Sequence, residues 1–135
     1  MPVTSGFNHV ATLTADMDRL VDFYKTVFGA EIIFEMLERP DHPHMIILDL
    51  GGGAALNVFE VAGDTIIGDR RSQGGRGPID HYALAVDSKA TLEAVRDRLA
   101  AAGADIGEIQ RLGSEWSLFF RDPDGMELEV CCHDD

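Results

Sequence analysis

The feature that most constrains this chain is an internal repeat with an offset of 72 residues. Segments 7–14 (FNHVATLT) and 79–86 (IDHYALAV) both run apolar, polar, histidine, and then continue as mostly apolar strands. The same shift carries Asn57 onto Glu129 and Gly53 onto Gly125 without a gap. We therefore interpret the chain as two copies of one small unit, neither of which can bury a sheet alone.

A helix is predicted after the opening strand of each copy, because apolar residues recur there at helical spacing. Asp16 and Ser88 are the expected N-caps, and Gly29 and Gly103 the expected ends. Three shorter strands are predicted after each helix. They cover residues 31–37, 44–50 and 54–60 in the first copy and 105–110, 117–121 and 126–132 in the second.

These elements predict an α+β fold of two βαβββ modules that form a cupped, barrel-like mixed sheet around one cavity. The first module is expected over residues 1–62 and the second over residues 78–135. Residues 63–77, rich in glycine and arginine, are expected to be a connector loop within one overall domain.

Composition excludes several classes of partner. Eleven basic and 24 acidic residues give a net charge of −13, which repels nucleic acid and anionic membranes. No apolar run approaches the roughly 20 residues that span a bilayer, and residues 1–4 do not begin a signal peptide. Cys131 and Cys132 are adjacent, so we expect them to point to opposite faces of a strand as reduced thiols. A cytoplasmic protein is expected.

The repeat also predicts a metal site. It places polar residues at equivalent positions of otherwise apolar strands: His9 and His81 on the opening strands, Asn57 and Glu129 on the closing ones. A buried carboxylate is costly unless it is paired or bound to metal. Two imidazoles and one carboxylate form a facial set that suits Fe, Mn, Ni, Co or Zn and leaves positions open for substrate. His9, His81 and Glu129 are the predicted ligands of one divalent ion per site, with Asn57 as a possible fourth position or substrate contact.

Nearly the whole chain resembles the vicinal oxygen chelate superfamily, which includes glyoxalase I, fosfomycin-resistance transferases, methylmalonyl-CoA epimerase, extradiol dioxygenases and bleomycin-resistance proteins. The resemblance rests on four motifs: NHV at residues 8–10, FYKTVFG at 23–29, DH at 80–81 and FRDPDGMELE at 120–129. The family's metal glutamate lies four residues after the glycine of the last motif, which implies Glu129 rather than Glu127. The resemblance also implies a homodimer.

The resemblance leaves the reaction open. Glyoxalase I carries a glutamate where this chain has Asn57, and an amide cannot act as a general base. We expect a metal-dependent glyoxalase-like lyase, isomerase or transferase that chelates a small oxygen-rich molecule and stabilises an oxyanion. The alternatives are an Fe(II) extradiol-type dioxygenase and a non-catalytic binding protein of the bleomycin-resistance kind. No catalytic acid or base is identified.

Several further residues are candidates for the substrate pocket. Phe59, Trp116 and Phe119 are predicted on strands near the cavity, although core packing is the commoner role of such residues. A dioxygenase would need a histidine or tyrosine near the metal, and His44 and Tyr82 are the candidates. Tyr82 follows His81 directly, so it is expected to point away. For a phosphonate substrate, the connector supplies three arginines: Arg70, Arg71 and Arg76.

Overall fold

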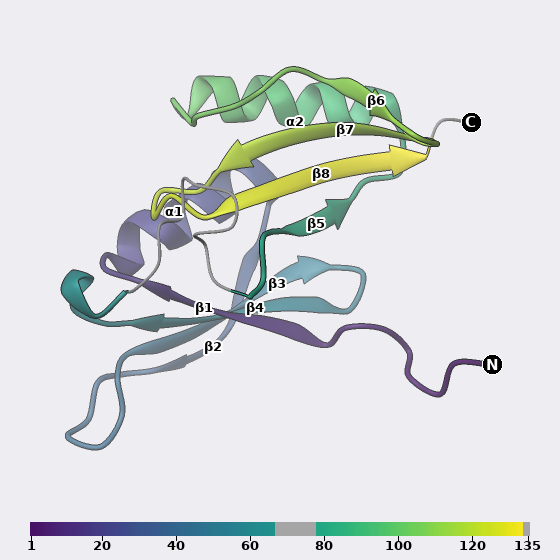
Figure 1. Ribbon diagram of the computed structural model, residues 1–135. Helices are drawn as coiled ribbons and strands as arrows, with labels where there is room; N and C mark the ends of the chain where they lie inside the picture. The colour runs from purple at the N-terminus through teal and green to yellow at the C-terminus, as the bar shows by residue number, and fades with distance from the viewer. Residues whose placement is uncertain (67–77, 134–135) are drawn as a thin grey trace. The chain divides into compact units, whose positions relative to one another are not determined.

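The computed structural model describes residues 1–66 and 78–133 and divides into two compact units, Met1–Ile67 and Gly68–Asp135. Among these described residues, each unit holds one α-helix and one open four-stranded sheet (Figure 1). The prediction of an α+β fold built from two βαβββ modules is therefore confirmed. Among the described residues, no helix is long and apolar enough to cross a membrane.

The first unit contains strand β1 (His9–Thr14), helix α1 (Met17–Phe28), and strands β2 (Glu31–Met36), β3 (Met45–Gly51) and β4 (Ala54–Glu60). The strand order is β1-β4-β3-β2, with β1 parallel to β4 and the other pairs antiparallel. A short 3₁₀ helix, η1 (Gly63–Thr65), follows and occupies the start of the expected connector. The rest of that connector, with Arg70, Arg71 and Arg76, lies outside the described residues.

The second unit repeats this plan with β5 (Tyr82–Ala85), α2 (Lys89–Ala101), β6 (Gln110–Leu112), β7 (Glu115–Arg121) and β8 (Glu127–His133). Its sheet has the order β5-β8-β7-β6, again with one parallel pair, β5 and β8. Helix α2 packs against β7 and β8 (Figure 1).

The two helices begin and end where their sequences predict. The side chain of Asp16 accepts a hydrogen bond from the backbone N–H of Arg19, and that of Ser88 accepts one from Thr91. Gly29 ends α1 at a φ of 66°, and Gly103 follows α2 at a φ of 72°. Both values lie in the left-handed region, where glycine carries no Cβ penalty.

Strand register shows that the duplication is structural as well as sequential. Asn57 lies opposite Ala11 and Ile47 in the first sheet. Glu129 lies opposite Ala83 and Phe119 in the second, and each of these residues is 72 positions further along. The turns before β4 and β8 also match, because Gly53 and Gly125 share a φ of 81°. The inner strands therefore present equivalent residues in equivalent places.

The edge strands follow a different offset. Gly29 corresponds to Gly103, an offset of 74. On the edge strand, Ile32 pairs with Leu48, and the equivalent pair in the second module is the isolated bridge between Ile106 and Phe120. From Ile32 to Ile106 the offset is again 74. The register of β2 shifts after Ile32, and the second module has an equivalent shift between Ile106 and Gln110. The hairpin after the edge strand is two residues longer in the first module, which restores the offset of 72.

The prediction of a strand over residues 105–110 is wrong for most of its length. Strand β6 begins only at Gln110 and has three residues. Residues 105–107 still hydrogen-bond to β7 through the backbones of Asp105 and Gly107. The shift in register separates these bonds from β6, so the segment does not form one continuous strand.

Each sheet has an apolar face that is packed on its helix. In the second unit the fully buried residues Leu118, Phe120, Leu128 and Val130 lie on that face. Residues of the opposite parity on the same strands, including Phe119 and Glu129, must lie on the other face. The face away from the helix is thus the one that carries the predicted metal ligand.

Candidate metal centre

Glu129 lies in the middle of β8, and a tight turn just before this strand fixes its position. The carboxylate of the buried Asp122 accepts hydrogen bonds from the backbone N–H groups of Asp124 (2.9 Å) and Met126 (3.1 Å). The N–H of Asp122 donates in turn to the carbonyl of Met126 (2.9 Å). The motif DPDG at residues 122–125 therefore closes the β7–β8 hairpin and sets the register that places Glu129 opposite Phe119.

His81 immediately precedes β5 and faces Glu129. The distance from His81 Nε2 to Glu129 Oε2 is 3.4 Å, and these side chains are 31% and 17% exposed. His81 Nδ1 lies 2.7 Å from a carboxylate oxygen of Asp80. An ionised carboxylate can only accept, so Nδ1 carries the proton of this hydrogen bond. In a neutral imidazole, Nε2 then presents a lone pair to Glu129.

Two further side chains complete this part of the second module. The ring of Phe119 meets the ring of His81 edge-on, with centroids 5.2 Å apart. Cys131 shares the face of Glu129, whereas Cys132 is buried on the opposite face, as expected for adjacent strand residues. Burial and the nearby carboxylate of Glu115 raise the pKa of the Cys131 thiol to about 12. Cys131 is therefore a neutral thiol near pH 7 and a poor nucleophile.

The first module carries the matching histidine. His9 begins β1 and is exposed, and its Nδ1 lies 2.7 Å from the side-chain oxygen of Asn8. Asn57 lies on the same face of the sheet, because its register partner Ala11 is two residues from His9. Each module thus holds a histidine whose Nδ1 is engaged by the preceding residue and whose Nε2 is directed elsewhere.

The structure brings together His81, Glu129 and Phe119, all within the second unit. His9 and Asn57 belong to the first unit. Within residues 1–66 and 78–133, no group of three or more His, Cys, Asp or Glu side chains is gathered closely enough to hold a metal ion. The assignment of His9 to the same site as His81 and Glu129 therefore stays a prediction.

Trp116 does not lie with Phe119 and Glu129. It is three residues from Phe119, so the pleat of β7 directs it to the helix-facing side. There the ammonium of Lys89, at the start of α2, lies 4.0 Å from the ring centroid, a cation–π contact. The prediction that Trp116 lines the same pocket is wrong. Tyr82 pairs with the buried Leu128 and has that same parity, so it points away from His81 as expected.

His44 likewise lies on the helix-facing side of its sheet, at the N-terminus of α1. Its Nε2 is 2.7 Å from Glu35 and its Nδ1 is 3.4 Å from Glu60. The hydrogen bond to Glu35, aided by the one to Glu60, raises the pKa of His44. Glu60 also accepts a 2.6 Å hydrogen bond from the backbone N–H of Met17, the first residue of α1. We call Glu35, His44 and Glu60 the His44 cluster.

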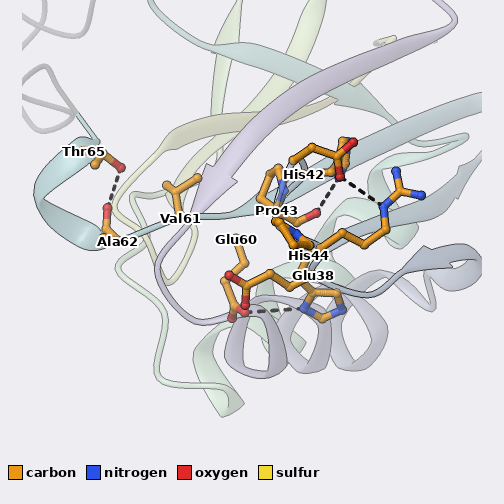
Figure 2. Close-up of a pocket in the computed structure, with 11 residues that line it drawn as sticks. Glu38, His42, Pro43, His44, Glu60, Val61, Ala62 and Thr65 are labelled. Carbon is orange, nitrogen blue, oxygen red and sulfur yellow. Dashed lines mark hydrogen bonds and ion pairs between the residues drawn. The ribbon is translucent and has the colours of Figure 1, made fainter.

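The His44 cluster borders an open pocket of about 710 Å³ in the first unit. Figure 2 shows its wall, made by the long hairpin at residues 38–44 and by the segment that follows β4. His42, on this hairpin, packs against Phe59 with ring centroids 6.0 Å apart. Phe59 shares strand parity with Asn57, so this candidate lies on the face of the predicted metal ligands, whereas His44 does not.

Sequence reasoning missed the roles of Asn8 and Asp80. Both were visible as the dipeptides Asn-His and Asp-His at equivalent repeat positions. It also missed Glu60 as a partner of the α1 N-terminus, because that contact joins residues 43 positions apart. No local sequence pattern predicts such a contact.

Comparison with known proteins shows the family of this chain. The model of the Glyoxalase/Bleomycin resistance protein/Dioxygenase superfamily matches residues 6–130. The chain belongs to this superfamily, as the motifs around His9, His81 and Glu129 suggested.

Individual proteins are also similar to this chain. The metallothiol transferase FosB of Shouchella clausii is 33% identical over an alignment 135 positions long. The alignment covers 95% of this chain and 80% of that protein. A glyoxylase/bleomycin resistance protein/dioxygenase domain from Frankia sp. EAN1pec superposes with a TM-score of 0.83 at 27% identity, covering 97% and 99% of the two chains.

A second solved structure holds a metal. It is a mutant of the fosfomycin resistance protein FosX of Listeria monocytogenes in complex with Mn(II) and 1S,2S-dihydroxypropylphosphonic acid. Its TM-score is 0.73 at 17% identity, with 95% of this chain and 92% of that chain covered. At this identity the likeness concerns the fold alone.

Proposed function

We propose that this protein is a divalent-metal-dependent enzyme that binds a small oxygen-rich substrate at the metal. His81 and Glu129 would hold the ion, His9 would complete a facial set, and Asn57 would contact the substrate or fill a fourth position. The proposal rests above all on the geometry of His81 and Glu129. Zinc, manganese, iron, cobalt and nickel all suit such ligands.

The donor atoms fit a metal ion. With Nδ1–H committed to Asp80, the lone pair of His81 Nε2 faces a carboxylate oxygen at 3.4 Å. Two acceptors at this distance repel each other unless a proton on Nε2 or a metal cation lies between them. Two ligands about 2.1 Å from one ion, at a roughly tetrahedral angle, are themselves about 3.4 Å apart. The observed spacing therefore fits two ligands of a common ion.

When bound, the ion would act as a Lewis acid toward the substrate's oxygen atoms. The chain's own residues would prepare the site around it. Asp80 orients the His81 ring, and Phe119 holds that ring from its edge and offers an apolar wall. Ala83 and Ala85, on the same face of β5, are small and leave room for a ligand.

Transfer of a thiol is the finer reaction that we favour within this class. The 33% identity to a metallothiol transferase supports it. Asn57 stands where glyoxalase-type isomerisation would use a carboxylate, and an amide cannot take a proton. An added thiol brings its own nucleophile, so it does not need that carboxylate. The two residues considered for a dioxygenase, His44 and Tyr82, lie on the helix-facing sides of their sheets, which disfavours that alternative.

Metal titration tests the proposal directly. The full chain would be stripped with a chelator and titrated with Mn²⁺, Zn²⁺, Ni²⁺, Co²⁺ and anaerobic Fe²⁺ by calorimetry. We expect one ion per chain for at least one metal. His81→Ala and Glu129→Gln should weaken binding by more than the roughly 10–100-fold that a lost outer-shell partner costs. Glu127→Gln is the matched control, two residues away on the same strand.

Activity would be assayed with the loaded protein, fosfomycin and a low-molecular-weight thiol, and the conjugate would be followed by mass spectrometry. We expect metal-dependent product that disappears in Glu129→Gln. Tight binding of an organic ligand without metal, unchanged in His81→Ala and Glu129→Gln, would instead identify a non-catalytic binding protein and refute the proposal.

We also propose that the protein is a homodimer with two such sites. The superfamily resemblance supports this arrangement. Light scattering coupled to size-exclusion chromatography should give about twice the 14.7 kDa chain mass, and a monomer at all concentrations would contradict it.

A further inference from the structure

We propose that Asp80 and Asn8 are positioning residues that fix the ring tautomers of His81 and His9, and that they make the second module the anchoring half of the metal site. The inference rests on the proposed function for the ligand role of the two histidines. The tautomers themselves can be tested without metal.

The geometry of the two pairs is the same. Each histidine Nδ1 lies 2.7 Å from a side-chain oxygen of the residue before it. An acceptor at this distance requires a proton on Nδ1, which leaves Nε2 as the ring's ligand atom. Metal-binding histidines commonly donate their other ring N–H to a carboxylate or carbonyl oxygen, which fixes the tautomer and ring orientation. Asn8 and Asp80 occupy equivalent repeat positions, so both modules have the same contact between a histidine and the residue before it.

The chemistry of the two pairs differs. Asp80 and Glu129 in the second module are carboxylates, whereas their repeat equivalents in the first module, Asn8 and Asn57, are both amides. A charged acceptor makes a stronger hydrogen bond than a neutral one, so Asp80 holds the His81 ring more firmly than Asn8 holds the His9 ring. The Nε2 atom of His81 already faces the carboxylate of Glu129 at 3.4 Å.

This asymmetry assigns different tasks to the modules. The anionic half, Asp80, His81 and Glu129, supplies most of the binding free energy for a divalent cation. In the proposed site the neutral group of the first module, Asn8, His9 and Asn57, would add one weaker ligand and polar amides, which would leave the ion with more positive charge to polarise the substrate.

Nuclear magnetic resonance of the metal-free full chain tests the tautomers. Spectra that correlate ring protons with ring nitrogens would be recorded at about pH 8.5, where ordinary imidazoles are neutral. We expect His81 and His9 to carry the proton on Nδ1. In Asp80→Ala, His81 should lose this preference, and Asp80→Asn, which keeps an acceptor oxygen, should retain it. Protonation of His81 on Nε2 in the wild-type protein would overturn the inference whether or not metal binds.

Metal affinity tests the division of tasks, with Co²⁺ and Zn²⁺ as probes. Asp80→Ala should weaken binding about 10–100-fold, and Asp80→Asn by less. Asn8→Ala should cost less than Asp80→Ala, and Asn8→Asp should strengthen binding. Asp97→Asn, an exposed charge change on α2, is the control and should have no effect. Equal losses in Asn8→Ala and Asp80→Ala would refute the asymmetry, provided that circular dichroism shows both variants folded.

If the wild-type protein binds none of the five divalent metals named for the titration, the proposed function fails. The tautomer spectra would still decide whether Asp80 and Asn8 position the rings.

Discussion

At the scale of single residues, the His44 cluster ties together three segments of the first module. His44 belongs to the long hairpin, Glu35 to β2 and Glu60 to the end of β4, and Glu60 also accepts from the first N–H of α1. The equivalent of His44 in the second module is Trp116, which packs under Lys89 instead. The same position thus carries a polar network in one copy and a cation–π contact in the other.

The raised pKa of His44 predicts pH-dependent stability. A group whose pKa is higher in the folded than in the unfolded chain stabilises the fold fully below the unfolded value of about 6.5. That contribution is lost as the pH rises through the folded value. Its size should stay below about 1 kcal/mol, because partly exposed ion pairs are screened by solvent.

Urea unfolding between about pH 5.5 and 8.5 would measure this effect. We expect His44→Gln to lose stability relative to the wild-type protein at the acidic end and to differ little at the basic end. His133→Gln, at a histidine whose side chain is 77% exposed, is the control. An equal loss for His44→Gln at all pH values would show that the cluster acts without His44 carrying a charge.

Some residue roles could be predicted and others could not, for physical reasons. The repeat offset correctly predicted the strand position of Glu129, because equivalent residues occupy equivalent places on the inner strands; its role as a metal ligand stays a prediction. Trp116 lies on the helix-facing side because it is three residues from Phe119 on β7, and an odd separation on a strand means opposite faces. The bond from Met17 to Glu60 could not be predicted, since no local periodicity encodes a contact between a helix N-terminus and a distant strand.

At the scale of elements, the helices were the most predictable because their signals are local. Caps and apolar stripes lie within the segment that they specify. Strand β6 was predicted poorly, because an edge strand of three residues has too little alternation to show a period. The inner strands, buried on the helix-facing side, carried clear alternation and were placed within one or two residues.

Removal of an N-cap should weaken the first module measurably. Asp16→Ala would leave the N–H of Arg19 without its 3.1 Å partner, at a cost of about 1 kcal/mol. Chemical unfolding followed by circular dichroism would report the change. Asp22→Ala, an exposed position inside α1, removes the same charge from a site where alanine favours the helix, so it should be neutral or slightly stabilising. Equal losses in both variants would point to charge rather than capping.

At the scale of the whole molecule, the dominant electrostatic fact is the net charge of −13. Like charges repel more strongly in the compact state than in the unfolded chain, so they destabilise the fold. The same negative charge attracts cations, which suits a protein proposed to bind one.

Moderate salt should therefore stabilise the metal-free protein. Between about 10 mM and 150 mM NaCl the screening length falls from about 30 Å to about 8 Å, which removes most long-range repulsion. We expect the midpoint of thermal unfolding to rise by a few degrees over this range. A midpoint that falls would mean that favourable ion pairs outweigh the net repulsion.

The two offsets of the repeat have a consequence for how such a chain tolerates change. Two extra residues enter near the end of the second helix, and two are removed from the hairpin after the edge strand, so the length difference cancels before the next inner strand begins. Insertions and deletions of residues in this segment do not change the register of β4 or β8. Evolution can therefore lengthen the first hairpin into a pocket wall while the strands that carry Asn57 and Glu129 stay in frame. For protein engineering, this edge of each module is the place for an insertion.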